Sequence, residues 1–327
     1  MQYHLNPDLK IIKTGYYGNP YRLNRFVGPY TSQNRNLYLK GLVWVFSSIW
    51  SKKNKKKDTY RLKVHQITQF PELEQNCIIW LGHASFYIQL NGVRIICDPC
   101  LTAPPFVKRI CPVPVSLDKL QVDYLLLSHG HYDHFDKKSI RMLARYPIEA
   151  LVPLNMGRLL HAISPKIRIQ EAAWYQQYKT RNHVDIFFLP AHHWHRRHLT
   201  DTNKVLWGSF LIRTSDITIY FAGDTAYNQH FSEIQNLFKR IDYAILPIGA
   251  YDPPFIMRNN HMNPEQAIHA FTDLNARYLI PMHYGTFDLT NETYGAPVRW
   301  LNRLKDQDNL YLNNKIIQLN PGIIYPF

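Results

Sequence analysis

From about residue 75 onward, short apolar runs repeatedly end near a residue that can bind a metal ion. The runs have the length and the β-branched content of buried strands, and they cover residues 77–81, 93–97, 123–128, 184–189, 217–222, 243–248 and 278–282. Helix candidates at 136–146 and 263–274 lie between them, and Pro264 stands where a first-turn proline is tolerated. This alternation predicts a layered α/β domain with buried sheets.

The segment 128–134 carries the strongest chemical signal. Its sequence, Ser-His-Gly-His-Tyr-Asp-His, places three imidazoles and one carboxylate within six residues, directly after an apolar strand. A regular strand would send His129 and His131 to one face and His134 to the other, whereas a turn lets them converge. Imidazole and carboxylate are ligands that zinc, manganese and iron accept. We therefore expect a metal site in the loop after this strand.

Further residues of the same kind follow other strands. His192 and His193 come after 184–189, Asp224 comes after 217–222, and His283 comes after 278–282. Sites in α/β proteins collect at strand ends on one edge of the sheet. Together with segment 128–134, and counting only one of His192 and His193, these positions supply five imidazoles and two carboxylates, which is too many for one tetrahedral zinc. The set predicts two metal ions about 3.5–4 Å apart with a bridging carboxylate.

Charge and cysteine content limit the class of protein. Lys and Arg number 38 against 24 acidic residues, giving a formal charge of +14, which favours phosphate esters, nucleic acid or an anionic membrane as partners. Four cysteines are too few for a disulfide-built scaffold. The most apolar run, 41–50, is about half the length that spans a bilayer, and the first residues do not form a secretory signal. We expect an intracellular protein, cytoplasmic or peripheral on a membrane.

Residues 1–70 differ in composition from residues 71–327, so we expect an N-terminal extension followed by the α/β domain. The extension contains an amphipathic helix candidate within 38–50, and five lysines follow it between 52 and 57. Two interpretations stay open. The helix packs on the main domain with a solvated basic tail, or it lies on a membrane surface with its lysines facing anionic lipid.

The order of the metal-capable residues resembles the ligand series of the metallo-β-lactamase fold. Finer motifs resemble its N-acyl-phosphatidylethanolamine-hydrolysing phospholipase D branch. They are Trp-Leu-Gly-His-Ala-Ser at 80–85, Cys-Asp-Pro at 97–99, Trp-Gly-Ser at 207–209, Phe-Ala-Gly-Asp-Thr-Ala-Tyr at 221–227, Pro-Ile-Gly-Ala-Tyr at 247–251 and His-Tyr-Gly-Thr-Phe at 283–287. The resemblance implies a four-layer αββα sandwich over 71–327 that holds two zinc ions.

The resemblance also implies roles for individual residues. One metal would be held by His129, His131 and a later His, the other by Asp133, His134 and His283, with Asp224 bridging them. The family's Pro-x-x-His-Trp pattern selects His193 over His192 as the later His.

Other roles are less directly implied. Asp133 would also orient the attacking hydroxide. Asp98 would accept an N–H from a ligating imidazole, and His261 would face the substrate phosphate. His83 is either a supporting neighbour of the ligands or a buried structural histidine, whereas His195 and His198 are expected at the rim.

The implied activity is zinc-dependent cleavage of N-acyl-phosphatidylethanolamine to N-acylethanolamine and phosphatidic acid at a phospholipid surface. Three other enzymes fit the same metal scaffold: a soluble phosphodiesterase, a nuclease and a lactonase. A nuclease would show a basic arm with interleaved aromatic residues, and none is evident, so no nucleic-acid partner is expected. A non-catalytic metal-binding protein is the remaining alternative.

Overall fold

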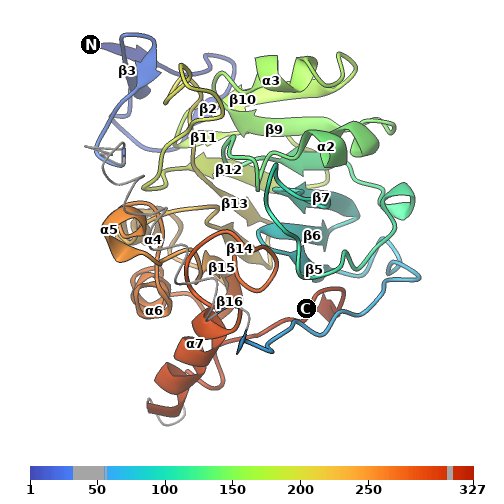
Figure 1. Ribbon diagram of the computed structural model, residues 1–327. Coiled ribbons are helices and arrows are strands. Elements are labelled where there is room, and N and C mark those ends of the chain that lie inside the picture. Colours follow the sequence, from blue (N-terminus) through green and yellow to red (C-terminus); the bar gives the residue numbers. More distant parts are fainter. Residues whose placement is uncertain (32–54, 56, 308–311) are drawn as a thin grey trace.

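Two seven-stranded sheets face each other in the computed structural model, which describes residues 1–31, 55, 57–307 and 312–327 (Figure 1). In spatial order the first sheet contains β10 (Arg168–Ala172), β9 (Glu149–Pro153), β8 (Tyr124–Leu126), β7 (Val93–Cys97), β6 (Ser85–Leu90), β5 (Cys77–Gly82) and β17 (Ile324–Pro326). The second contains β16 (Tyr278–Met282), β15 (Tyr243–Pro247), β14 (Thr218–Phe221), β13 (Ser209–Arg213), β12 (Asp185–Leu189), β11 (Gln176–Gln177) and β2 (Lys10–Ile11).

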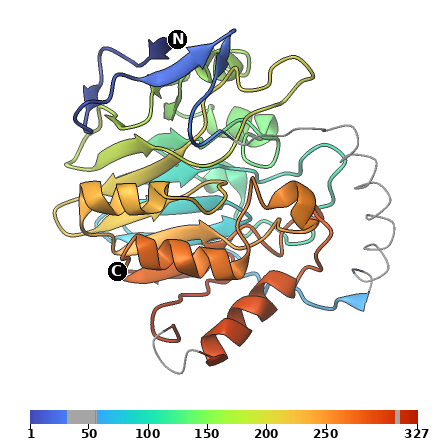
Figure 2. The same cartoon turned by 90° about the vertical axis from the view of Figure 1, so that its left-hand side faces the viewer.

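Helices cover the outer faces of both sheets. The helices described are α2 (Lys137–Leu143), α3 (Gly157–His161), α4 (His230–Phe238), α5 (Pro254–Met257), α6 (Pro264–Asp273) and α7 (Ala296–Gln307), with a 3-10 turn at Leu117–Lys119. Of these, α6 lies against β15, and α7 packs on α6. Figure 2 shows α4 and α6 lying side by side in front of the second sheet. Helices α2 and α3 lie on the other side of the molecule, against the first sheet (Figure 1).

Alternating side chains of β5 explain the layering. Ile78 and Trp80 belong to the core between the two sheets, whereas Ile79 and Leu81 pack in a second core with Ile140 of α2. Successive side chains of a strand point to opposite faces, so a fully buried strand must be covered on both sides. The layers are therefore helix, sheet, sheet, helix, and the predicted αββα sandwich is confirmed.

Both predicted helices begin at the expected caps. The carboxylate of Asp136 accepts the backbone N–H groups of Lys138 and Ser139 at the start of α2. Asn263 and Gln266 form a reciprocal capping box at the start of α6, and Pro264 occupies the first turn. These caps fix where the loops that precede the helices end.

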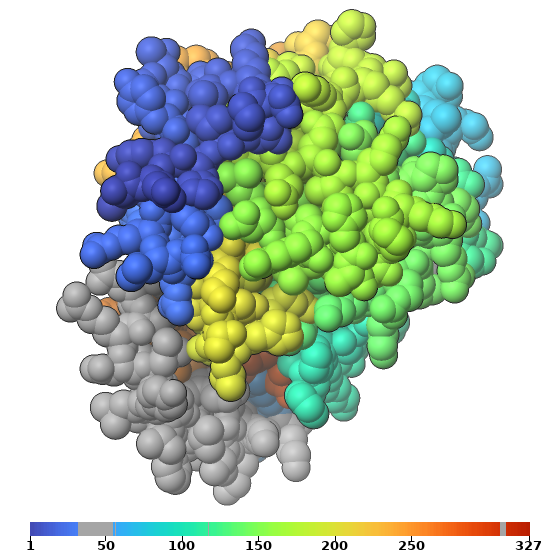
Figure 3. All heavy atoms as spheres, turned by 90° about the horizontal axis from the view of Figure 1, so that it is seen from above, coloured from blue at the N-terminus to red at the C-terminus, as the bar shows by residue number. Residues whose placement is uncertain are grey.

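The first 31 residues are built into the domain. Strand β2 pairs with β11 at the edge of the second sheet, and Asn6 donates from Nδ2 to the carbonyl oxygen of Glu171 at 2.7 Å. Strands β1 (Gln2–His4), β3 (Asn19–Arg22) and β4 (Arg25–Phe26) form a small sheet of their own. Figure 3 shows this segment in blue against later parts of the chain.

The predicted amphipathic helix and most of its lysines lie outside the described residues. Lys55 is one of the lysines that the structure describes. It is buried and forms an ion pair with Asp288 and a hydrogen bond to the carbonyl oxygen of Thr290. Lys55 is therefore not part of a solvated basic tail, because its charge is matched inside the protein. Within the described residues, no helix combines the length and apolar character needed to cross a bilayer.

Candidate metal centre

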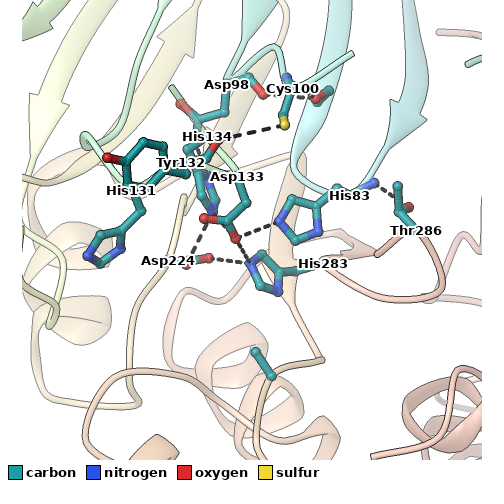
Figure 4. A network of polar contacts seen from close by, with 12 residues as sticks. His83, Asp98, Cys100, His131, Tyr132, Asp133, His134, Asp224, His283 and Thr286 are labelled. Atoms are coloured by element: carbon teal, nitrogen blue, oxygen red, sulfur yellow. Dashed lines mark hydrogen bonds and ion pairs between the residues drawn. The ribbon is translucent and has the colours of Figure 1, made fainter. Parts of the chain in front are cut away.

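The predicted site residues lie at strand ends where the two sheets meet. The loop with His129 and His134 follows β8, Asp224 follows β14, and His283 follows β16 directly. Strands β7 and β8 run parallel in one sheet, and β14, β15 and β16 run parallel in the other, so their carboxyl ends share an edge. The long-range pairing of these strands brings residues more than 150 positions apart into one centre (Figure 4).

Three imidazoles and one carboxylate form the first group. His131 Nδ1 lies 2.9 Å from His129 Nε2 and 3.1 Å from His193 Nε2, and Asp224 Oδ2 lies 3.9 Å from the same two Nε2 atoms. A tetrahedron with Zn–N bonds of about 2.0–2.1 Å has edges of about 3.3 Å. The distances between the imidazole nitrogens are therefore close to those expected when the nitrogens bind one cation.

The second group contains His134, His283, Asp133 and Asp224. His134 Nε2 lies 3.1 Å from Asp224 Oδ2, His283 Nε2 lies 3.1 Å from Asp224 Oδ1, and Asp133 Oδ2 lies 3.6 Å from both nitrogens. His134 Nε2, His283 Nε2 and Asp224 Oδ1 are buried without a hydrogen-bond partner. Buried polar atoms are normally satisfied, and a cation at this point would satisfy all three. The residues present thus fit a pair of metal ions, with Asp224 between the two groups.

Neighbouring groups fix the orientation of three of these imidazoles. Asp98, fully buried, lies with Oδ2 2.7 Å from His134 Nδ1. His129 Nδ1 lies 2.9 Å from Ser128 Oγ, and His193 Nδ1 donates to a backbone carbonyl at 3.0 Å. A hydrogen bond on one ring nitrogen sets the tautomer and leaves the other nitrogen free to bind a metal.

The charge states also suit cation binding. Burial and neighbouring imidazoles lower the pKa of His131 to about 4, so its ring is neutral with a free electron pair at pH 7. Burial alone would raise the pKa of Asp133 and Asp224, but the surrounding histidines outweigh it and hold both carboxyls well below their usual range. In return the two carboxylates overcome burial and raise the pKa of His283 to about 9. A metal ion would take the place of that proton.

The backbone at the site adopts left-handed conformations. Asp98 has φ +40°, His283 has φ +65° and Gly223 has φ +59°. A Cβ on Gly223 would stand 2.6 Å from Cβ of Ser128, so this position needs glycine. Conformations of this kind concentrate at functional sites, where surrounding packing maintains them.

The structure separates the two candidates in the Ala-His-His segment. His193 is buried in the first group, whereas His192 is only partly buried and its Nδ1 lies 2.6 Å from Asn228 Nδ2. His198 is exposed, as expected of a rim residue. His195 corrects the prediction: it is fully buried, and its ring lies nearly parallel to that of His131 with centroids 6.4 Å apart.

The absence of a side chain at Gly130 explains why His195 is buried. A Cβ at Gly130 would lie 2.1 Å from Cε1 of His195, so the imidazole occupies the space that a side chain would fill. We expect Gly130→Ala to destabilise the protein by about 1–3 kcal/mol, as overpacking does. Chemical denaturation measures this loss. In the background His195→Ala the same substitution should cost much less, and equal costs in both backgrounds would contradict the packing explanation.

Arg197 supports the metal-binding loop and was not predicted. Its buried guanidinium donates to the carbonyl oxygens of Gly130 at 2.7 Å and Phe135 at 3.0 Å, and it stacks on the ring of Tyr132. From the sequence alone, a basic residue such as Arg197 among polar neighbours is expected on the surface. No local pattern indicates that it reaches back under segment 128–134.

Comparison with known proteins places the chain in a family. Residues 93–284 match the family model described as "Beta-lactamase superfamily domain". The chain is 30% identical over 284 residues to "N-acyl-phosphatidylethanolamine-hydrolyzing phospholipase D 1" of Caenorhabditis elegans, covering 81% of this chain and 80% of that protein. It is also 30% identical over 216 residues to a "UPF0173 metal-dependent hydrolase" of Caldivirga maquilingensis, covering 64% and 82%.

Coverage and structural similarity vary among the other matches. A Saccharomyces cerevisiae protein named "N-acyl-phosphatidylethanolamine-hydrolyzing phospholipase D, mitochondrial" is 33% identical over 69% of this chain, which spans 51% of that protein. The crystal structure of a possible metal-dependent hydrolase from Veillonella parvula matches with a TM-score of 0.64 at 15% identity, over 77% of this chain and 100% of that one. The last match supports the fold alone.

The chain therefore belongs to the beta-lactamase superfamily domain family. Its fold and the clustered histidines and aspartates are those of a metal-dependent hydrolase of the metallo-β-lactamase superfamily.

Proposed function

We propose that this protein is a zinc-dependent phosphodiester hydrolase with two metal ions, and that its substrate is N-acyl-phosphatidylethanolamine. The observation that carries the proposal is the position of Asp224. Its two carboxylate oxygens lie 3.1 Å from imidazole nitrogens of the second group, and Oδ2 also faces the first group. A buried carboxylate that lies between two sets of imidazole and carboxylate ligands can bridge two cations. The substrate class rests on the nematode and yeast relatives.

The ligand assignment follows the two groups. His129, His131 and His193 would hold one zinc ion, Asp133, His134 and His283 the other, and Asp224 both. Zinc in such a site lowers the pKa of water toward about 7 and stabilises charge on a phosphoryl group. Asp133, whose side chain is 16% exposed, would also orient the attacking hydroxide.

His261 and Asp98 would contribute differently. The side chain of His261 is 14% exposed, whereas those of His134 and His283 are 0% and 2% exposed. Nδ1 of His261 lies 3.7 Å from Asp224 Oδ2. Burial lowers its pKa to about 4, so at pH 7 the neutral ring can bind a phosphate oxygen or exchange a proton with it. Asp98 is buried behind His134 and therefore acts by positioning that imidazole.

Hydrolysis in ¹⁸O-labelled water tests the reaction class. Attack on phosphorus forms a new P–O bond and breaks the bond to the ethanolamine oxygen, which leaves with a proton. The label should therefore appear in phosphatidic acid and not in N-acylethanolamine, as measured by mass spectrometry with zinc-loaded protein. Label in a carboxylate product would instead identify carbon as the centre attacked.

The same assay separates the rival substrates. Similarity to the UPF0173 hydrolase is as high in identity as that to the nematode phospholipase, so the panel should include cyclic nucleotides, single-stranded DNA and lactones. Turnover of a water-soluble phosphodiester at least as fast as of the phospholipid would favour the soluble phosphodiesterase or the nuclease. Turnover of lactones alone would favour the lactonase.

Peripheral binding to anionic lipid is the second part of the proposal. Phe106 and Leu199 are among the most exposed apolar side chains described. They lie one and two positions along the chain from Pro105 and Arg197, which line a cavity together with Tyr132 and Lys137. Exposed apolar groups beside lysines suit an anionic phospholipid surface. The cavity adjoins the metal-binding loop through Tyr132, so lipid bound here would lie near the site.

Substituting these two residues tests the surface. We expect Phe106→Ser with Leu199→Ser to weaken binding to sedimented vesicles of phosphatidylserine and phosphatidylcholine roughly 30-fold, because the two side chains each lose about 1 kcal/mol of apolar burial. Leu23→Ser is the control, since Leu23 is also a highly exposed apolar residue but lies in the turn between β3 and β4. Equal loss in the control, or none in the double variant, would contradict this surface.

A further inference from the structure

His83 is a buried histidine beside the second group that the proposed mechanism does not use. It lies in the turn between β5 and β6 with φ +56°, and its side chain is 2% exposed. Its Nε2 lies 3.0 Å from Asp133 Oδ2 (Figure 4). This is shorter than the 3.6 Å that separates the same oxygen from His134 or His283.

The same residue also contacts His283. The backbone N–H of His283 donates to the carbonyl oxygen of His83 at 3.0 Å, and the two rings have centroids 3.9 Å apart. Two hydrogen bonds hold the backbone of His83. Its backbone N–H donates to Thr286 Oγ1 at 2.7 Å, and Trp80 Nε1 donates to its backbone carbonyl oxygen at 2.9 Å. One fixed residue thus touches two members of the second group.

Charge determines the direction of the hydrogen bond. His83 Nε2 and Asp133 Oδ2 lie within hydrogen-bond distance, and a carboxylate that binds a cation is ionised. An ionised carboxylate only accepts, so the N–H of His83 must lie on Nε2. That donor fixes one oxygen of Asp133 and hinders rotation of the carboxylate away from His134 and His283.

We propose that His83 is a positioning residue that holds Asp133 and His283 in place for the second metal ion. The inference rests on the metal centre of the proposed function, but not on its substrate. Partners of this kind behind a metal ligand are worth about 10–100-fold in metal affinity. Loss of His83 should therefore weaken binding of the second metal ion and leave binding of the first unchanged.

Two substitutions that differ in reach test the proposal. His83→Asn tolerates the left-handed backbone but is too short to bond Asp133, whereas the amide of His83→Gln extends to the position of Nε2. Zinc binding is measured by competition with a chromophoric chelator, and metal content by elemental analysis. We expect two zinc ions per chain in the wild type, a 10–100-fold weaker second step in His83→Asn, and near-wild-type affinity in His83→Gln. The control, His198→Asn, changes an exposed histidine.

Several outcomes would overturn the proposal. These are wild-type affinity in His83→Asn, equal weakening of both steps, and failure of His83→Gln to restore the second step. Near-ultraviolet circular dichroism shows whether each variant is folded. If His83→Asn does not fold, Thr286→Val is used instead. It removes the acceptor of the backbone N–H of His83 and should weaken only the second zinc-binding step. A chain that behaves as expected but hydrolyses no phosphodiester would refute the proposed function and leave this inference standing.

Discussion

Replacing Asp224 by Asn should lower hydrolytic activity by about 10³-fold or more. The amide keeps the shape but removes the negative charge that faces His129, His134 and His283 across the two groups. Removing a group that stabilises transition-state charge already costs about 10²–10³-fold, and this substitution should also weaken both metal sites. Steady-state kinetics with zinc in excess measures the loss.

The control for this experiment is Asp216→Asn, an exposed carboxylate on the turn before β14. It should keep wild-type activity and metal content. Metal content separates the two causes of inactivity in Asp224→Asn. Full activity in the Asp224 variant with two metals bound would show that the carboxylate is not the bridge.

Removing the metal should abolish hydrolysis and lower thermal stability together. Without a cation, His134 Nε2, His283 Nε2 and Asp224 Oδ1 are buried and have no hydrogen-bond partner. A ligand present at 1,000 times its Kd stabilises the folded state by about 4 kcal/mol, which for a protein of this size corresponds to a Tm difference on the order of 5–10 °C.

Calorimetry and activity are measured on the same chelated sample. Dialysis against a chelator should lower both, and added zinc should restore both, with manganese and iron compared under the same conditions. Recovery of Tm without activity would indicate the wrong metal. A chelated protein that keeps full activity and an unchanged Tm would contradict a metal-dependent mechanism.

Several features of the fold could be predicted because their cause is local. The strands at 93–97 and 278–282 begin and end where the predicted runs do, since short runs rich in β-branched or apolar residues favour a buried strand over a helix. The starts of α2 and α6 follow from Asp136 and Asn263, whose side chains cap helices through neighbours in the sequence. Strands β6 and β13 were not predicted, because each contains an apolar run of only three residues bounded by polar ones, Ser85 and Gln89 in β6 and Ser209 and Arg213 in β13.

The misassigned residues were decided by distant partners. Lys55 was expected to be exposed, either in a solvated tail or facing anionic lipid, but Asp288 lies 233 positions away and pairs with it inside the protein. His195 was expected at the rim, but the space above Gly130 admits its ring. Neither neighbour is visible from the local sequence.

By itself, the amino-acid sequence determined which side chains are available for metal binding, because the ligand types and their places after strands are written in short motifs. Only the tertiary structure decided how they act together. It placed Asp224 between the two groups, Asp98 behind His134, and His83 against Asp133. These contacts join strands of two sheets across long stretches of chain, so they depend on how the whole core packs and not on any local preference.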